Sequence, residues 1–348
     1  MRRFLILFLG ILAVGAIAFF LFFQKENPEK KSFLPIFSGQ KTFFGKKISA
    51  PDDLAPPPDH HSILTGLPRE NPENPEKILA VMIEESVAAR GNYRGISAAK
   101  ILFEMPAEGG IPRFAAIFSG DDAPAEIGPV RSARDYFLKM IAPIAPAIVH
   151  AGGSPAAFSF LKTSKIRDLN RKSETDDRFF RDQNLFPPHN LFVVFSKIKN
   201  EIPEISGQKP VFHFSKKIPD GPTAAAIQID FSSENHRVDY TFDADKKCFH
   251  RAQKFEKTKM CFENIAVIET QIALIDGDEK GRLAVKTTGD GAATIFRDGR
   301  KITGKWRRKK DQKIEFFDAD GDPIFFRPGK TIVEIIDRPE KLRTQTFF

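Results

Sequence analysis

Hydrophobic and polar residues occur in distinct blocks along this chain, and each block predicts a different kind of structure. The first block, residues 4–23, contains no charged or hydrogen-bonding side chain. A helix of that length is about 30 Å long, which matches the hydrocarbon core of a bilayer. A helix in a soluble core would need a polar face, and this segment has none. The pattern therefore predicts one transmembrane helix within residues 1–24.

A cleavable signal peptide is the alternative interpretation of the same segment. The apolar region of a signal peptide is shorter and ends at small residues, whereas this one ends with Phe22 and Phe23 directly before Gln24. We therefore expect an uncleaved signal-anchor that crosses the cell membrane once, with the bulk of the chain extracytoplasmic. Residues 25–62 are rich in proline and include a triplet at 56–58, which predicts an extended tether.

Between residues 63 and 210, apolar runs of strand length alternate with segments of helical spacing. Residues 132–141 have helical spacing, and Ser154 followed by Pro155 is typical of the start of a second helix. Strands that alternate with helices predict an α/β domain, in which ligands bind at the carboxyl ends of the strands. Four apolar runs are typical of strands covered on both faces, namely residues 78–83, 101–104, 113–119 and 147–150.

From residue 222 to 338 the pattern changes to short stretches of alternating polar and apolar residues. Residues 294–303 predict a hairpin around an Asp-Gly turn, residues 315–326 predict a second hairpin, and Asp276-Gly277 marks another turn. The expected fold class is thus an α/β N-terminal globular domain plus a smaller, mostly antiparallel β C-terminal domain, after the transmembrane helix.

Composition narrows the choice of partners. A hydrophobic fraction of 41% and a charged fraction of 28% are ordinary for a globular protein. The net charge of +8 favours acidic partners such as lipid headgroups or phosphate-bearing envelope polymers. No nucleic-acid-binding motif accompanies the dispersed charge, so nucleic acid is not an expected partner. The sequence also contains no P-loop, dinucleotide-binding or metalloprotease motif, so we predict no cofactor and no metal.

Three arginines in the first domain are the strongest candidates for a binding site. Arg113, Arg131 and Arg134 lie in a stretch rich in glycine and proline, and their guanidinium groups could converge on one anion. Guanidinium groups form paired hydrogen bonds with phosphate and carboxylate, and the amides of glycine-rich loops add further donors. We predict a ligand-binding set that consists of Arg113, Arg131, Ser132, Arg134, Gly152, Gly153, Ser154, Arg181 and Asn190.

Two acidic residues in the same stretch are candidates for catalysis. Glu104 and Glu108 could act as a general acid and base, or hold Mg²⁺ or Ca²⁺. Because arginines and acids this close in sequence often pair with each other, the alternative is that both residues only brace loops.

Histidines and serines form a second group of candidates. His150, Asp182 and His189 could build a base or a metal site, with Ser154 or Ser132 as a nucleophile. Structural roles remain open for each group. His150 directly follows an apolar strand and would also serve as a hydrogen-bonded core residue, Ser154 as a helix cap, and His189 as a loop brace.

Cys248 and Cys261 are the only cysteines. They lie at the edges of predicted strands around a lysine-rich loop, a spacing compatible with a hairpin. Outside the membrane such a pair can form a disulfide, which would contribute on the order of 3 kcal/mol. We therefore treat them as a candidate disulfide.

Over residues 62–336 the chain resembles the YerB-like family of bacterial envelope proteins, whose two characteristic regions are domains of unknown function. The resemblance implies an envelope location but no activity. Better-known members resemble lipoproteins held by an acylated cysteine, and this chain has no cysteine near its N-terminus. The family's arginine is also missing from Asn184-Leu-Phe-Pro187. The matching segments include Leu64-Thr-Gly-Leu67, Glu104-x-Pro-x-Glu108-Gly-Gly-x-x-Arg113, Gly128-Pro-Val-Arg-Ser-Ala-Arg134, His150-Ala-Gly-Gly-Ser-Pro155, Phe179-Phe-Arg-Asp182, Pro188-His-Asn190, Phe296-Arg-Asp-Gly299 and Phe317-Asp-Ala-Asp-Gly321.

Three classes of function agree with these features. The first is a membrane-anchored envelope protein that binds an anionic glycan, a lipid-linked phosphate or an acidic partner protein. The second is an envelope enzyme, a hydrolase or a phosphoryl or glycosyl transferase, that uses the same arginines and acids. The third is a structural scaffold of an envelope complex. We favour the first. Convergence of Arg113, Arg131 and Arg134 with Glu104 and Glu108 around an open pocket would favour the first two classes, and mutual salt bridges without a cavity would favour the third.

Overall fold

The computed structural model describes residues 60–345. The predicted anchor, residues 1–24, and all but the last residues of the tether lie outside the described residues. Within residues 60–345, no helix has both the length and the apolar character needed to cross a bilayer.

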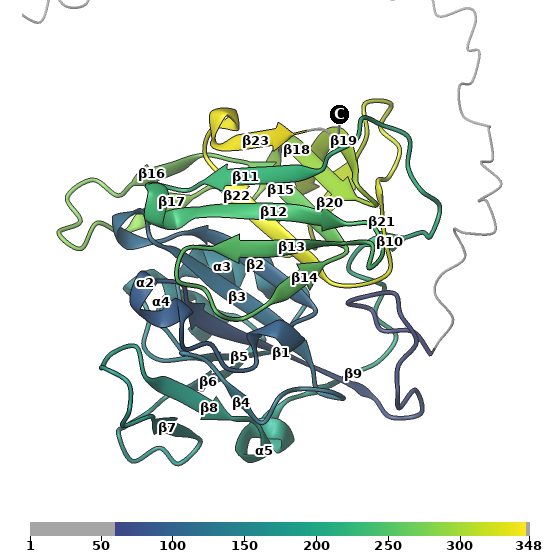
Figure 1. Cartoon of the computed structure of the whole chain (residues 1–348). Helices are drawn as coiled ribbons and strands as arrows, with labels where there is room; N and C mark the ends of the chain where they lie inside the picture. Colours follow the sequence, from purple (N-terminus) through teal and green to yellow (C-terminus); the bar gives the residue numbers. More distant parts are fainter. Residues whose placement is uncertain (1–59, 346–348) are drawn as a thin grey trace, which may run out of the picture. The chain divides into compact units, whose positions relative to one another are not determined.

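The central element is a mixed eleven-stranded sheet that takes strands from both predicted domains (Figure 1). Its order is β20-β19-β18-β15-β22-β2-β3-β1-β5-β6, and β9 pairs with the start of β1. The parallel pairing of β2 with β22 joins the two halves of the sequence. The strands are β1 (Glu76–Glu84), β2 (Ile101–Pro106), β3 (Pro112–Ser119), β5 (Ala147–His150), β6 (Arg167–Asn170), β9 (Glu204–Ile205), β15 (Asn264–Glu269), β18 (Gly289–Arg297), β19 (Arg300–Arg308), β20 (Glu315–Phe317) and β22 (Thr331–Ile336).

A five-stranded antiparallel sheet covers one face of the central sheet (Figure 1). It has the order β14-β13-β12-β11-β23, and its members are β11 (Ala226–Asp230), β12 (Arg237–Asp243), β13 (Cys248–Gln253), β14 (Met260–Phe262) and β23 (Leu342–Gln345). Three small sheets complete the described strands: β4 (Glu126–Ile127), β7 (Phe179–Arg181) and β8 (Leu191–Val194); β10 (His213–Phe214) and β21 (Phe325–Phe326); β16 (Ile272–Leu274) and β17 (Leu283–Val285).

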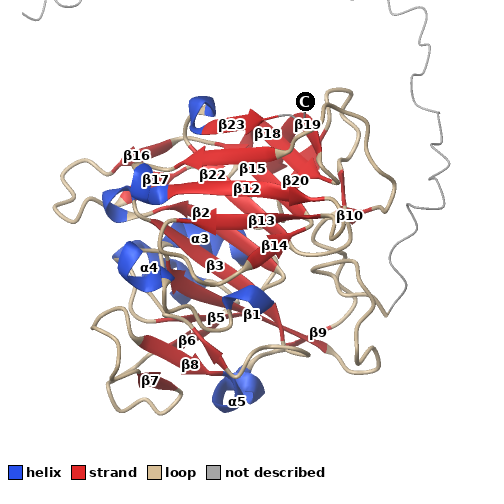
Figure 2. Ribbon diagram, in the orientation of Figure 1, coloured by secondary structure: helices blue, strands red, loops and turns tan. Residues whose placement is uncertain are grey.

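Helices are few and short, so the described chain is mostly β (Figure 2). The predicted α/β class for the N-terminal half is therefore corrected. All four predicted strands are present, but β2 and β3 join through a tight turn rather than a helix and pair antiparallel. The helices are α2 (Val87–Arg90), α3 (Asp135–Ile141), α4 (Pro155–Thr163) and α5 (Phe195–Ile198), with short 3₁₀ turns η2 (Ile96–Ala98), η3 (Glu108–Gly110), η4 (Lys199–Glu201), η5 (Glu234–His236) and η6 (Pro339–Lys341).

Alternate residues of the central strands supply two separate hydrophobic cores. On β1, Ile78, Ala80 and Met82 pack with residues of α3, whereas Leu79 and Val81 face the five-stranded sheet. This division follows from the two-residue period of a strand, and both faces are apolar because both are covered. The continuous apolar pattern of these strands thus reports a layer on each side of the sheet.

Local predictions about turns and caps have mixed outcomes. Ser154 caps α4 by accepting a hydrogen bond from the Ala157 amide at 3.1 Å, as predicted. The turn between β18 and β19 is confirmed, with φ of 51° at Asp298 and 65° at Gly299. Of the second predicted hairpin only one bridge, between Phe317 and Pro323, is present. The rest of that prediction is wrong, because β20 pairs with β19 and β21 pairs with β10. Pro323 has no amide hydrogen and interrupts a continuous ladder there.

The two cysteines lie on neighbouring strands of the five-stranded sheet. Cys248 on β13 and Cys261 on β14 are joined in a disulfide, with their Cα atoms 5.6 Å apart. In the antiparallel register Cys261 is opposite His250, which is two residues after Cys248, so the two cysteines are diagonal neighbours on the two strands. The bond ties the edge strand β14 to the sheet.

Candidate functional site

Strands β1, β5 and β6 run parallel and end at one edge of the central sheet. Their last residues are Glu84, His150 and Asn170. We call this border, with the loops that follow the strands, the carboxyl edge. Ligands of sheets with parallel strands bind at such an edge, so the predicted site residues are described from here.

Two loops at the carboxyl edge are bound to each other by backbone hydrogen bonds. The Ala151 amide donates to the Arg131 carbonyl at 3.1 Å, and the Ala133 amide donates to the Gly152 carbonyl at 2.9 Å. The Ser132 hydroxyl donates to the Ala151 carbonyl at 2.8 Å. Gly152 has φ of 74°, a conformation that favours glycine, and this places its carbonyl for the contact. The predicted Gly-rich loop therefore fixes the backbone that carries Arg131.

The first charged group at this edge is built on Glu108. Its carboxylate accepts a hydrogen bond from Arg134 Nε and lies 3.4 Å from Arg113 Nη2. Arg113 Nη1 also donates to the Ser132 carbonyl at 2.7 Å. Burial acts to raise the pKa of Glu108, but the bonds to Arg134 and the charge of Arg113 lower it overall. Glu108 is therefore an ionised partner for two arginines.

The second charged group is built on Glu84, whose side chain is only 6% exposed. Its Oε1 accepts hydrogen bonds from Ser86 Oγ at 2.9 Å and from His189 Nδ1 at 2.8 Å. Arg131 Nε lies 3.4 Å from Oε2 of the same carboxylate. The sequence prediction missed Glu84 and Ser86. The signal was present, because Glu84 is the first polar residue after the apolar run of β1.

The two groups are adjacent. Glu84 on β1 and Arg113 on β3 are directly opposite each other in the antiparallel register, and both point to the α3 face of the sheet. Burial and the nearby charges of Arg134 and Arg131 lower the pKa of Arg113, which falls to about 10. The three predicted arginines thus lie in two adjacent groups, in which they are paired with two carboxylates.

Glu104 does not belong to this site. It pairs with Phe114 in the β2–β3 register, while its neighbour Met105 pairs with Arg113, so Glu104 points to the opposite face of the sheet. There it is completely buried between the two sheets, where both its oxygens accept hydrogen bonds from Arg251 Nη2 at 3.0 Å. The predicted pairing of Glu104 with Glu108, as an acid/base pair or as ligands of one cation, is therefore wrong.

Glu104 is part of an inter-sheet charge cluster. Arg251 on β13 also binds Glu256 at 2.8 Å, and Glu85 and Glu334 complete the acidic neighbours. Tyr240 donates a hydrogen bond to Glu334. Burial raises the pKa of Glu104 well above its usual value and raises that of Glu334 to about 7. The cluster connects strands of both sequence halves.

His150 lies in the protein interior and not at the surface. The ring is completely buried, Nδ1 lies 2.7 Å from the Gly152 carbonyl, and Nε2 lies 2.9 Å from Asp168 Oδ1. Both nitrogens are engaged, so neither can take a proton from a substrate. Ser154 is likewise buried and used as the cap of α4, and Gly153 forms a bridge with Ala133. These residues support the site without facing it.

The remaining predicted residues brace the loop that carries His189. The Asn190 side-chain amide donates to the carbonyls of Asp182 and Leu185 at 3.0 and 3.2 Å, and its oxygen accepts from Arg181 at 2.9 Å. The Asp182 carboxylate pairs with Arg94. Asp182 is therefore not the partner of a catalytic histidine, and Glu84 takes that position beside His189.

Among residues 60–345, one group of three potential metal ligands lies close together, namely Cys248, His250 and Cys261. Two of its members are joined in the disulfide, and a thiol must be free to bind a metal as a thiolate. His250 Nε2 instead contacts Asp243 at 3.0 Å. The group is best described as a disulfide beside a histidine–carboxylate pair.

Comparison with protein families gives two consecutive matches. The model described as the N-terminal domain of a protein of unknown function (DUF3048) matches residues 64–208. The model described as the C-terminal domain of the same family matches residues 227–333. Residues 209–226 lie between the two matched segments, and both segments contribute strands to one sheet.

Comparison with individual proteins identifies a Bacillus subtilis relative. The chain is 27% identical over 332 residues to "Putative lipoprotein YerB" of strain 168, which covers 91% of this chain and 92% of the relative. The crystal structure of YerB protein from Bacillus subtilis superposes with a TM-score of 0.73 at 26% identity. That match covers 82% of this chain and 99% of the other.

Proposed function

We propose a function from the premise that the chain belongs to the DUF3048 family. The function is that of a membrane-anchored protein of the cell envelope that binds an anionic group at the carboxyl edge. Envelope location is supported by the printed name of the Bacillus subtilis relative, a lipoprotein. It is also supported by the long apolar segment at residues 4–23.

The means of anchorage differs in this proposal from that of a lipoprotein. A lipoprotein is attached through an acylated cysteine near its N-terminus, and this chain has two cysteines, Cys248 and Cys261. Both are joined in the disulfide of the five-stranded sheet. We therefore assign anchorage to residues 4–23 as a single membrane-spanning helix, with the tether and the described residues on the extracytoplasmic side.

Arg131 is the single observation that carries the binding proposal. At the carboxyl edge three arginines share the carboxylates of Glu84 and Glu108, which leaves one positive charge in excess. The Arg131 side chain is the most exposed of the three at 32%, and its contact with Glu84 is loose at 3.4 Å. Its remaining N–H groups are available to a phosphate or carboxylate. The salt bridges of the three arginines alone would favour a scaffold, and the excess positive charge at Arg131 is what supports a binder.

An anion titration of the full-length protein in detergent micelles tests the binding proposal. Inorganic phosphate is expected to raise the melting temperature of the wild type saturably. Arg131→Gln is expected to weaken phosphate binding by about tenfold or more, because a charge-assisted bond contributes roughly 1.5–3 kcal/mol. Arg343→Gln is the matched control, since Arg343 is 67% exposed and also lies 3.4 Å from one carboxylate, that of Asp230.

Two results would contradict the proposal. One is a wild-type melting temperature that does not respond to phosphate. The other is an equal loss of response in the Arg131 and Arg343 variants, which would indicate general screening of surface charge.

A second candidate function, an envelope hydrolase or transferase, is favoured by the contact of Glu84 with His189. A carboxylate bound to Nδ1 orients a histidine so that Nε2 can accept a proton. The His189 side chain is 25% exposed. Ser86 Oγ lies 3.5 Å from Nδ1 rather than near Nε2, so the nucleophile in this hypothesis is water or a substrate hydroxyl.

A turnover assay with bis(p-nitrophenyl) phosphate and p-nitrophenyl glycosides separates the two candidates. If His189 is a general base, His189→Gln is expected to lower the rate by about 100-fold or more. His250→Gln is the control, because His250 is also paired with a carboxylate, Asp243 at 3.0 Å, and is 40% exposed. Absence of wild-type turnover, or an equal rate in both variants, would remove the enzymatic candidate and leave the binder.

A further inference from the structure

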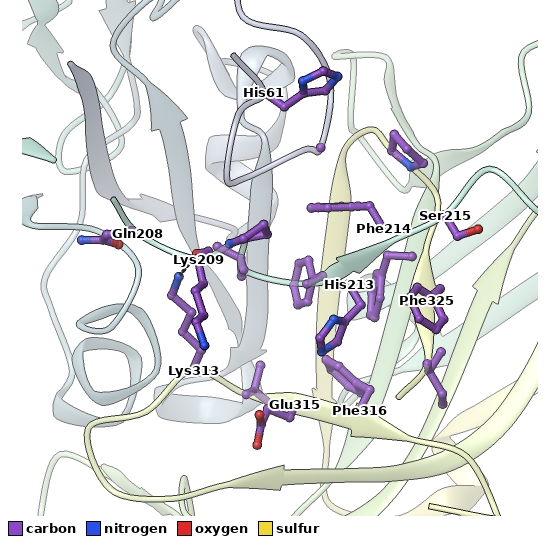
Figure 3. Close-up of a pocket in the computed structure, with 18 of the residues that line it drawn as sticks. His61, Gln208, Lys209, His213, Phe214, Ser215, Lys313, Glu315, Phe316 and Phe325 are labelled. Carbon is purple, nitrogen blue, oxygen red and sulfur yellow. Dashed lines mark hydrogen bonds between the residues drawn. The ribbon is translucent and has the colours of Figure 1, made fainter. Parts of the chain in front are cut away.

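A cavity of about 960 Å³ lies away from the carboxyl edge (Figure 3). Its walls come from residues 208–216, which connect the two halves of the sequence, and from residues 311–316, 324–326 and 328. His61, Gly66 and Pro143 complete the lining. Volumes of this size are typical of small-molecule sites, in which apolar walls carry a few polar groups.

The cavity and the carboxyl edge are at opposite ends of β1. Burial lowers the pKa of Lys313 in the cavity wall, and the nearby carboxylate of Glu76, the first residue of β1, offsets part of that decrease. Glu84 is the last residue of the same strand. The strand has 9 residues, and the steps between its first and last residue, at about 3.3 Å each, separate these ends by roughly 26 Å. A ligand in the cavity would therefore not touch Arg131.

One side of the cavity is a wall of phenylalanine rings. Phe212 and Phe326 stack with their centroids 4.3 Å apart, and Phe316 lies 5.3 Å from Phe326. These three rings are buried and fix the wall, whereas Phe214 and Phe325 are half-buried and border the open space (Figure 3). In the parallel register of β10 with β21, Phe214 is opposite Phe326 and Phe325 is opposite His213, so the two outer rings point to different faces of this pair. The wall therefore offers rigid apolar ring faces.

Lysines also line the cavity, and Figure 3 shows Lys209 and Lys313 across from Phe325. Lys209 and Lys216 are exposed, and Lys313 is half-buried with its Nζ donating to the Lys209 carbonyl at 2.5 Å. Within residues 60–345 the structure gives none of these three lysines an ion pair with a carboxylate. Asp311 and Glu315 are the two acids of the lining, so the ionised lysines leave a net positive charge.

This combination selects one class of ligand. An apolar ligand would use the ring faces but would cover ammonium groups that have no ion pair with a carboxylate, which costs free energy. A simple inorganic anion would use the lysines but would leave the rings exposed to water. A sugar ring has an apolar C–H face that stacks on an aromatic ring and hydroxyls that bond polar side chains. A carboxylate or phosphate on that sugar would pair with the lysines.

We propose that this cavity binds an acidic saccharide, with a sugar ring against Phe325 and His213 and the anionic group of the saccharide at Lys313 and Lys209. The site is separate from the carboxyl edge and does not depend on the function proposed for it. His213, whose ring centroid lies 5.8 Å from that of Phe325, extends the stacking surface at the rim.

Calorimetric titration of the full-length protein in micelles with two matched disaccharides tests this site. The probes are N-acetylglucosaminyl-N-acetylmuramic acid and N,N′-diacetylchitobiose (below, chitobiose), which differ by one carboxylate-bearing group, and a third arm uses glucose 1-phosphate. The wild type is expected to bind the acidic disaccharide about tenfold more tightly than chitobiose. The third arm shows whether a phosphate replaces the carboxylate.

Variants separate the two halves of the proposed contact. Lys313→Gln and Lys209→Gln are expected to remove the preference for the acidic disaccharide and to leave chitobiose binding unchanged. Phe325→Ala is expected to weaken binding of both disaccharides. Lys162→Gln, at an exposed position in the last turn of α4, is the control and is expected to bind like the wild type.

The proposal is overturned if the wild type binds neither disaccharide at millimolar concentration. It is equally overturned if binding is present but does not respond to Lys313→Gln, Lys209→Gln or Phe325→Ala in variants that retain the wild-type melting temperature. Two lysine variants are used so that the failure of one to fold does not decide the outcome.

Discussion

Replacement of Arg251 by methionine is expected to lower the free energy of unfolding by about 3–5 kcal/mol at pH 7. Arg251 is completely buried and contacts Glu104 at 3.0 Å, Glu256 at 2.8 Å and Glu85 at 3.7 Å. Its removal would leave several buried carboxylates near each other without a cation. The acids would then have to be protonated or exposed, and both changes cost stability.

Urea denaturation of the full-length protein in micelles measures this effect. Arg343→Met is the control, because Arg343 is 67% exposed, and a change below about 0.5 kcal/mol is expected there. The double variant Arg251→Met with Glu104→Met should be more stable than the sum of the single effects predicts, since the pair is removed together. A loss below about 1 kcal/mol in Arg251→Met would contradict a role for the inter-sheet charge cluster in joining the two sheets.

Stability is also expected to fall as the pH rises from about 5 to 7. Burial raises the pKa of Glu334 to about 7, while the same group in the unfolded chain titrates near 4.5. Between these values the folded protein binds more protons than the unfolded protein, so stability is present at the lower pH and is lost as the pH increases. A shift of this size corresponds to on the order of 3 kcal/mol at most.

Urea titrations at pH 5, 6 and 7 check this direction. Glu334→Gln imitates the protonated acid, so the pH dependence of its stability should be smaller than that of the wild type. Glu315→Gln, at an exposed position on β20, is the control and should retain the wild-type slope. Equal slopes for the wild type and Glu334→Gln would show that Glu334 is not the group that titrates.

The strands of the first domain were predictable because they carry a local signal. Ile78, Ile101 and Ala147 each begin an apolar run inside a strand that is covered on both faces. The helix that starts after Ser154 was predictable for the same reason, since a cap and a proline lie next to each other in sequence. The connections between the strands were harder to predict from the sequence, because a turn and a short helix need a similar number of residues.

The placement of Glu104 was not predictable from its neighbours. Its distance in sequence from Arg113 suggested a shared site, but the β2–β3 register places the two side chains on opposite faces. Its partner Arg251 is 147 residues away, and no local pattern reports such a contact. The parallel pairing of β2 with β22 was unpredictable for the same reason, because it joins two apolar strands that are far apart in the sequence.

The candidate site was predicted in outline and missed in part. The convergence of Arg113, Arg131 and Arg134 followed from loops that meet at one sheet edge. Glu84 was overlooked because the polar residue that ends a strand has no motif of its own. His189 was selected, but its partner could be identified only when the loop that carries it was placed beside β1.

The account depends most on Arg131 as the contact for an anion at the carboxyl edge. Two-dimensional NMR of the arginine Nε–Hε groups in the full-length protein, titrated with inorganic phosphate, reports that contact directly. Arg131 is expected to shift saturably, while the resonance of Arg343 moves little. A linear, unsaturated drift of equal size at both arginines would contradict the account, because it would mean that phosphate meets Arg131 only as it meets any surface charge.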